Sequence, residues 1–209
     1  MDYNALKMTD EVIQQIPPLS LEKINQILDA YTLQNFSFDK AALPCVLLLL
    51  PDDESKSGHY IALAQSDDKK TLYYFDSYGY NPLNLWAEHP QMIGEKQDID
   101  KWGEFLKQYD KVIFNEKKLQ NDNSNICGFY CITYIYEFNS RSIDFTPEIF
   151  KFFIEQIKKN YDLLSYDNAL IIYFSKVVAN LNKWYDEAQR GRSVMLDKSS
   201  ELKAQKGER

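Results

Sequence analysis

The chain has 209 residues, of which 44% are hydrophobic and 14% aromatic; this is typical of one sizeable folded domain and excludes a disordered or fibrous protein. Its formal net charge of -7 argues against a general nucleic-acid binder, which needs a basic face, but leaves room for a local basic patch. The longest apolar run, Val46 to Leu50, is far too short to span a membrane.

The three cysteines, Cys45, Cys127 and Cys131, have neither the number nor the spacing of a disulfide framework. With only two histidines in the chain, a structural zinc site is not expected either, and the sequence indicates no cofactor. Residues 1–11 lack the basic start and apolar core of a signal peptide. The expected location is therefore a reducing intracellular compartment.

The first half of the chain predicts one helix and three strands. Residues 20–31 predict a helix that Ser20 can cap, and a loop follows. Residues 44–50 have no polar face, which predicts a strand buried on both sides. Strands at 59–65 and 71–76 are separated by a short polar turn, which predicts an antiparallel hairpin.

The second half is mainly helical. Residues 77–94 are expected to be irregular because glycine and proline interrupt them. The later elements are a short strand at 112–114 and helices at 98–109, 127–139, 147–160 and 165–188. This order indicates a single α+β domain over residues 1–188, followed by a polar and frayed tail at 189–209.

A candidate nucleophile stands where polar turn residues give way to an apolar run. Residues 119–126 are mostly polar, Cys127 follows directly, and residues 132–138 are mostly apolar. This layout predicts a loop that leads into a buried helix with Cys127 in its first turn. A helix N-terminus offers backbone N–H groups and a partial positive charge, both of which favour a thiolate. Cys45 and Cys131 are expected to be buried packing residues.

A cysteine nucleophile needs a base, and histidine has an ordinary pKa near neutrality. His59 begins a predicted strand and is favoured over His89, whose simplest interpretation is a surface loop residue. Asp76 ends the strand that pairs with the His59 strand, so the hairpin places the two side chains side by side. From local sequence alone, Asp76 could equally cap the turn that follows it, and His59 could be a half-exposed strand end.

Gln120 precedes Cys127 by seven positions. Its amide and the Cys127 N–H could together hold the oxyanion that forms when a thiolate attacks a carbonyl. Taken alone, an exposed glutamine is the simpler interpretation. The acidic residues 52–54 lack the spacing and the glycine of a calcium loop. They are expected to form a solvated turn, and no metal site is predicted.

These pieces together resemble a known family. His59-Tyr60, the segment Phe75–Gly79, Gln120 and the segment Cys127–Cys131 resemble the adenain-like cysteine proteases, which are the adenovirus-type maturation proteases. The clan also contains the SUMO-specific proteases. The resemblance covers residues 45–138 and rests on the order histidine, acid, glutamine, cysteine with similar separations.

The resemblance implies a role for each site residue. Cys127 would be the nucleophile, His59 its base, Asp76 the residue that orients His59, and Gln120 a part of the oxyanion hole. It also implies a papain-like or adenain-like fold, in which a small mixed sheet packs against a central helix that bears the nucleophile. Additional C-terminal helices would complete the domain.

The implied function is that of a cysteine endopeptidase for capsid or core precursor proteins of a virus or virus-like element. Its substrates would carry small residues, especially glycine, before the cut. It would act in the host cytoplasm, in a virus factory or in the virion.

Three features depart from the family. Tyr60 stands where tryptophan often follows the histidine, and Asp76 replaces the glutamate of adenovirus members, as in the SUMO-protease branch. The activators of adenovirus members, a disulfide-tethered peptide and DNA, are not carried over. Cys45 and Cys131 are expected to be buried, and the chain is acidic.

Three alternative functions remain at this point. An isopeptidase that removes a SUMO- or ubiquitin-like modifier would use the same site but would dock a folded partner. An acyltransferase of the same clan would need a basic pocket for a coenzyme, and the sequence shows no such signature. An inactive binding module would retain the fold without the chemistry, against which the four intact site positions argue.

Overall fold

The computed structural model describes residues 10–49, 58–88, 96–141 and 144–175. The chain divides into one compact unit of residues 1–173 and a second of residues 174–209. The predicted domain end at residue 188 and the predicted tail lie outside the described residues, as does the predicted solvated turn at residues 52–54. These three remain predictions.

The described residues form one five-stranded sheet in the order β1-β2-β3-β4-β5. The strands are β1 (Ala30–Thr32), β2 (Cys45–Leu49), β3 (His59–Gln65), β4 (Thr71–Asp76) and β5 (Lys111–Phe114). The pairs β2–β3 and β3–β4 are antiparallel, whereas the edge strands β1 and β5 run parallel to their neighbours. The predicted hairpin of β3 and β4 is therefore confirmed, and it lies inside the sheet rather than at its edge.

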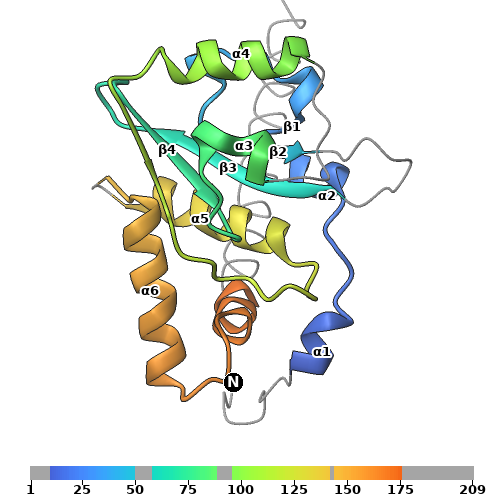
Figure 1. Cartoon of the computed structure of the whole chain (residues 1–209). Helices are drawn as coiled ribbons and strands as arrows, with labels where there is room; N and C mark the ends of the chain where they lie inside the picture. Colours follow the sequence, from blue (N-terminus) through green and yellow to red (C-terminus); the bar gives the residue numbers. More distant parts are fainter. Residues whose placement is uncertain (1–9, 50–57, 89–95, 142–143, 176–209) are drawn as a thin grey trace, which may run out of the picture. The chain divides into compact units, whose positions relative to one another are not determined.

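Helices lie on both sides of this sheet (Figure 1). The helices are α1 (Asp10–Gln14), α2 (Leu21–Asn25), α3 (Leu85–Glu88), α4 (Lys96–Leu106), α5 (Cys127–Ser140) and α6 (Pro147–Asn160), and residues 166–175 are also helical. In Figure 1, α4 lies on one side of the sheet and α5 on the other. Helix α6 begins as predicted, because the Thr146 hydroxyl accepts a hydrogen bond from Ile149 N and Pro147 occupies the first turn.

The prediction of a helix over residues 20–31 is wrong in its second half. Ser20 caps the helix as expected, but α2 ends at Asn25. The Asn25 side chain accepts a hydrogen bond from Ala30 N at 3.0 Å and so stabilises a turn in the chain. Residues 30–32 then pair with β2 as strand β1, with Tyr31 opposite Leu47.

The described part of the predicted irregular segment, residues 77–88, is more ordered than its glycine and proline suggest. Pro82–Asn84 form a 3₁₀ turn that continues into α3. The Trp102 indole of α4 donates a hydrogen bond to Pro82 O at 2.9 Å, which ties the turn to the neighbouring helix. This contact is tertiary, so local sequence could not reveal it.

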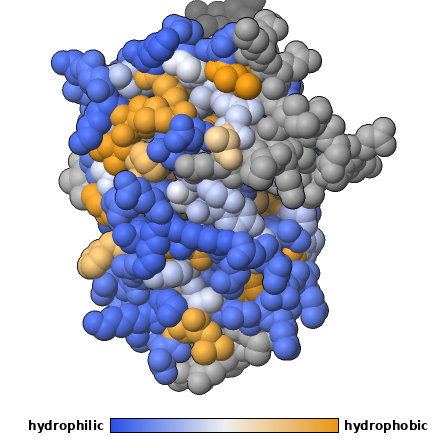
Figure 2. All heavy atoms as spheres, viewed as in Figure 1, coloured by the Kyte–Doolittle hydropathy of each residue, from blue (hydrophilic) through white to orange (hydrophobic). Residues whose placement is uncertain are grey.

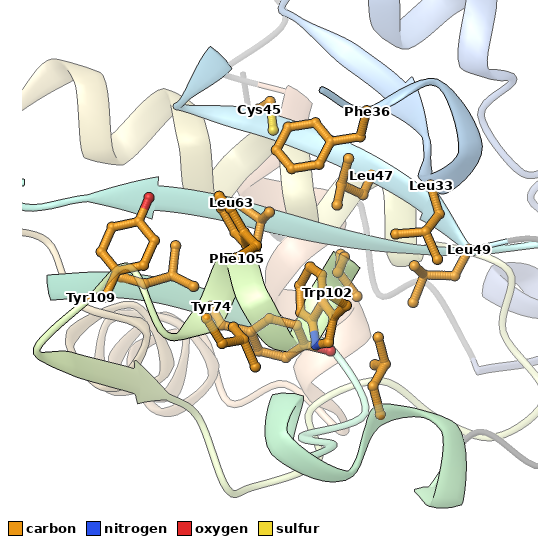
Figure 3. Close-up of a cluster of buried hydrophobic side chains, with 14 residues drawn as sticks. Leu33, Phe36, Cys45, Leu47, Leu49, Leu63, Tyr74, Trp102, Phe105 and Tyr109 are labelled. Atoms are coloured by element: carbon orange, nitrogen blue, oxygen red, sulfur yellow. The ribbon is translucent and has the colours of Figure 1, made fainter. Parts of the chain in front are cut away.

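One hydrophobic core lies between the sheet and α4 (Figure 3). Its buried members are Leu33, Phe36, Cys45, Leu47, Leu49, Ile61, Leu63, Leu72, Tyr74, Leu85, Trp102, Phe105, Leu106 and Tyr109. The strand residues among them alternate along β2, β3 and β4, as expected for side chains on one face of a sheet. The predicted helix at 98–109 is thus confirmed as α4, which begins two residues earlier and ends three residues earlier than predicted.

The opposite face of the sheet packs against α5. Phe75 of β4 lies 5.1 Å from Tyr134 of α5 and 5.0 Å from Phe150 of α6, measured between ring centroids. The Cys131 thiol donates to Tyr60 O at 3.3 Å, which shows how closely α5 approaches β3. Both faces of β3 are therefore covered, and its five inner residues are buried.

The predicted fold class is confirmed. The structure is α+β, with a small mixed sheet packed against the helix that begins at Cys127. The face of the molecule in Figure 2 is largely hydrophilic, with its main apolar area in the upper part. The apolar side chains on the two faces of the sheet are instead buried against α4 and against α5.

Candidate active site

The hairpin places His59 and Asp76 at the same end of the sheet. Ile61 pairs with Asp76 across the two strands, and His59 stands two residues from Ile61 on the same face. Diagonal neighbours of this kind are within reach of long side chains. His59 Nε2 lies 2.9 Å from Asp76 Oδ1, so the structure brings these two predicted residues together.

Asp76 is fully buried and is surrounded by donors. Its Oδ1 also accepts a hydrogen bond from Tyr78 N at 2.7 Å, and its Oδ2 accepts one from the Tyr74 hydroxyl at 3.2 Å. Asp76 therefore lies beside His59 and also caps the turn that follows β4, as the sequence allowed. The same oxygen, Oδ1, makes both contacts. Buried carboxylates are costly unless they are satisfied in this way.

Cys127 occupies the first turn of α5, as predicted. Ile126 is the N-cap, and no described side chain caps this helix end. The backbone N–H groups of Tyr60 and Gly128 hydrogen-bond to the Cys127 sulfur instead. The side chain is buried, with 6% of its surface exposed, so a reacting group must approach it closely.

The electrostatics of the site favour an ion pair between Cys127 and His59. Burial alone would raise the pKa of the Cys127 thiol, but the hydrogen bond and the positive charge of His59, with the two N–H groups, bring it below its ordinary value. Burial alone would lower the pKa of His59, but Asp76 and Cys127 raise it to about 10. Because Nε2 is engaged by Asp76, Nδ1 is the ring nitrogen that can face the sulfur.

Gln120 is buried in the loop before α5, with 1% of its surface exposed. The interpretation as an exposed residue is therefore wrong. Its Oε1 accepts from the Ser77 hydroxyl at 2.7 Å, and its Nε2 donates to Ser124 O at 2.5 Å and to the Tyr78 hydroxyl at 3.3 Å. Since a carbonyl oxygen can only accept, the contact with Ser124 fixes which way the amide faces.

Three residues around the site were not singled out from the sequence. Asn115 follows β5, accepts from Asp76 N at 3.1 Å and donates to Asp76 O at 2.6 Å. The Tyr78 ring stacks on the His59 ring at 4.8 Å, and Ser77 holds Gln120. Parallel pairing of β4 and β5 brings their carboxyl ends together, so a prediction of that pairing would have indicated Asn115.

Gly79 closes the turn that carries Asp76 and Tyr78. Its φ is +74°, and a Cβ there would lie 2.8 Å from the Lys117 carbonyl carbon. Gly79→Ala should therefore lower the free energy of unfolding by about 2 kcal/mol, through backbone strain and this clash.

Urea denaturation measures this effect, with Gly103→Ala as the matched control. A Cβ at Gly103, inside α4, meets nothing within 4 Å. That substitution should raise stability by about 0.5–1 kcal/mol, since alanine is the better helix former. Equal stability of Gly79→Ala and the parent chain would contradict the prediction.

The remaining candidate residues make none of these site contacts or lie outside the described chain. Cys45 and Cys131 are buried as expected, and all three cysteines are free. His89 and the acidic residues 52–54 lie outside the described residues, so the interpretations given to them stay open. Within the described ranges, no group of three histidine, cysteine or carboxylate side chains could hold a metal ion. No helix there has the length and apolarity needed to cross a membrane.

Comparison with known families agrees with this geometry. The family model described as adenovirus endoprotease matches residues 38–158, which is more than half of the chain and includes Cys127, His59, Asp76 and Gln120. No curated protein sequence matches the chain. The chain therefore belongs to the adenovirus endoprotease family and is a cysteine protease.

Proposed function

We propose that this viral cysteine endopeptidase works with a Cys127–His59–Asp76 triad and a Gln120 oxyanion hole. The observation that carries the proposal is the position of His59, which hydrogen-bonds both to the buried Asp76 carboxylate and to the Cys127 thiol. Base, orienting acid and nucleophile thus form one continuous chain of contacts. This is the arrangement that activates a cysteine nucleophile.

In the first half-reaction, the Cys127 thiolate attacks the carbonyl carbon of the scissile bond. A carbon–sulfur bond forms, and the carbonyl oxygen takes up the negative charge. The His59 imidazolium then gives its proton to the leaving amine as the carbon–nitrogen bond breaks. In the second half-reaction, neutral His59 removes a proton from water, which hydrolyses the thioester and regenerates the thiolate.

Gln120 and the Cys127 N–H would stabilise the oxyanion. The amide of Gln120 is held by Ser77 and Ser124, so it needs little reorganisation when the charge develops. Its contact with the Tyr78 hydroxyl is long, at 3.3 Å. We assign the N–H that faces Tyr78 as the one that donates to the oxyanion in place of the Tyr78 hydroxyl.

The substrates we propose are capsid or core precursor proteins with glycine before the cut. The burial of the site supports small residues there, since only 6% of Cys127 and 12% of the His59 side chain are exposed. Three free cysteines and a thiolate nucleophile suit a reducing location, for which we propose the host cytoplasm, a virus factory or the virion.

The test is to incubate the protein with precursor proteins encoded by the same genome and to map new termini by mass spectrometry. Protein alkylated with iodoacetamide serves as the inactive control. We expect new termini after glycine only with the unmodified protein. Cleavage of modifier-linked fluorogenic substrates, without cleavage of precursors or of Gly-Gly peptides, would instead establish an isopeptidase.

A further inference from the structure

A second buried carboxylate lies behind the candidate oxyanion hole. Asp167 stands in the helix of residues 166–175 and is fully buried. Its hydrogen-bond donors among the described residues are neutral groups, so hydrogen bonds rather than an ion pair offset its desolvation. Its position in the chain is also notable, because it lies beyond the family match, which ends at residue 158.

The partners of Asp167 come from the two segments that flank the nucleophile. Oδ2 accepts from the backbone N–H of Asn121 at 3.2 Å, and Oδ1 accepts from the Tyr130 hydroxyl at 2.9 Å. The Ser124 side chain supplies a further hydrogen bond. Asn121 directly follows Gln120, and Tyr130 lies one helical turn after Cys127.

We propose that Asp167 is a positioning residue that sets the separation between the two oxyanion donors, the Gln120 amide and the Cys127 N–H. The Asp167 carboxylate links the loop that carries Gln120 to α5, the helix that carries Cys127. This inference rests on the proposed function, and it assigns part of the site to a helix outside the family match.

The electrostatics of Asp167 agree with a constrained arrangement. Burial raises the pKa of its carboxyl, and the hydrogen bonds from Ser124, Tyr130 and Asn121 oppose that shift. If the loop that carries Asn121 moved away from α5, the buried Asp167 carboxylate would lose a hydrogen-bond donor. The carboxylate therefore resists any change in the distance between loop and helix.

The helix that carries Asp167 is itself held in place. Asp10 of α1 accepts from the Ser165 hydroxyl at 2.9 Å and from the Asn168 side-chain amide at 3.0 Å, and Ser165 caps the helix by accepting from Asn168 N at 3.2 Å. Asp10 thus anchors the N-terminal end of the helix of residues 166–175, and these contacts do not involve the loop before α5. This makes Asp10 a matched control for Asp167.

Asp167→Asn tests the proposal because it keeps the size of the side chain and replaces an acceptor by a donor. The amide NH₂ must then face either the Asn121 N–H or the Tyr130 hydroxyl. On a fluorogenic peptide with Gly-Gly before the cut, kcat should fall by about 10–100-fold, since small displacements of catalytic donors have effects of this size. KM should stay within about threefold of the parent value.

Two reagents separate oxyanion geometry from thiolate formation. A peptide aldehyde ending in glycinal adds to the Cys127 sulfur and creates an oxyanion-like centre, so Asp167→Asn should weaken its binding in parallel with kcat. Iodoacetamide loses iodide as its carbon–sulfur bond forms and needs no oxyanion donor. Its rate with Cys127 should stay within about twofold of the parent rate.

Controls keep the outcomes distinct. Asp10→Asn should lower the melting temperature without lowering kcat; an equal loss of kcat in both variants would show general helix docking and overturn the inference. If Asp167→Asn does not fold, Tyr130→Phe removes one donor and keeps the ring, and should lower kcat by about 3–10-fold.

The behaviour of the parent protein separates a failure of this inference from a failure of the proposed function. A parent that cleaves the peptide and binds the aldehyde, together with unchanged values for Asp167→Asn or Tyr130→Phe, overturns the inference alone. A parent that neither cleaves nor binds overturns the proposed function, and the inference with it.

Discussion

Replacing Cys127 by alanine should abolish peptide cleavage, with a loss in kcat of about 10⁵–10⁶-fold, because a methyl group cannot act as a nucleophile. Alanine fits the first turn of α5 and removes only a sulfur atom that is held by His59 and two backbone N–H groups. The free energy of unfolding should change by no more than about 1 kcal/mol. Peptide hydrolysis and urea denaturation measure the two quantities.

Cys131→Ala provides the opposite pattern one turn further along the same helix. Cys131 is fully buried and donates to Tyr60 O, but it takes no part in the proposed chemistry. Its replacement should cost about 1–2 kcal/mol of stability, through a small cavity and a lost hydrogen bond. Activity per folded molecule should remain. Cleavage by Cys127→Ala at a rate above about 1% of the parent rate would refute the assignment of the nucleophile.

The sequence allowed prediction of the site residues that local pattern and hairpin topology bring together. His59 and Asp76 could be paired because a short turn joins two strands, and the ends of a hairpin must meet. Cys127 could be placed in a first turn because polar turn residues give way to an apolar helix. The start of α6 followed from the same kind of local rule, since Thr146 and Pro147 are typical residues of a helix start.

The parts that could not be predicted depend on contacts between distant segments. The pairing of β1 with β2 turns a predicted helical stretch into a strand, and nothing within residues 20–31 signals that partner. The burial of Gln120 requires Ser77, which is 43 positions away in the chain. Asp167 gives no local signal at all, since its donors come from a loop and a helix more than 30 residues earlier. In such cases, contacts between distant segments override the local preference of the sequence for helix or strand.

Asp76→Asn should lower kcat/KM by about 10²–10⁴-fold, because an amide holds the His59 ring less well and no longer stabilises the imidazolium. The amide must also place its NH₂ group either toward His59 Nε2 and Tyr78 N, which share Oδ1, or toward the Tyr74 hydroxyl, which contacts Oδ2. A loss of about 1–3 kcal/mol in stability is therefore expected as well. Activity is to be compared at equal folded fraction.

The pH profile distinguishes the electrostatic role of Asp76 from a merely structural one. In the proposed mechanism, activity requires the Cys127 thiolate and the His59 imidazolium together. It should therefore fall at low pH, when the thiolate is protonated, and at high pH, when the imidazolium loses its proton. Burial lowers the pKa of His59 while Asp76 and Cys127 raise it to about 10. Without the Asp76 charge the alkaline limb of peptide hydrolysis should move to lower pH.

Asp68→Asn is the control for this shift. Asp68 lies in the turn at the other end of the same hairpin, where it accepts from the Ser66 hydroxyl at 2.6 Å and from Lys70 N at 3.0 Å. It is far along the strands from His59, and solvent screens its charge. Its replacement should leave the alkaline limb in place. An alkaline limb that stays fixed in Asp76→Asn, despite a fall in rate, would mean that Asp76 orients His59 without setting its pKa.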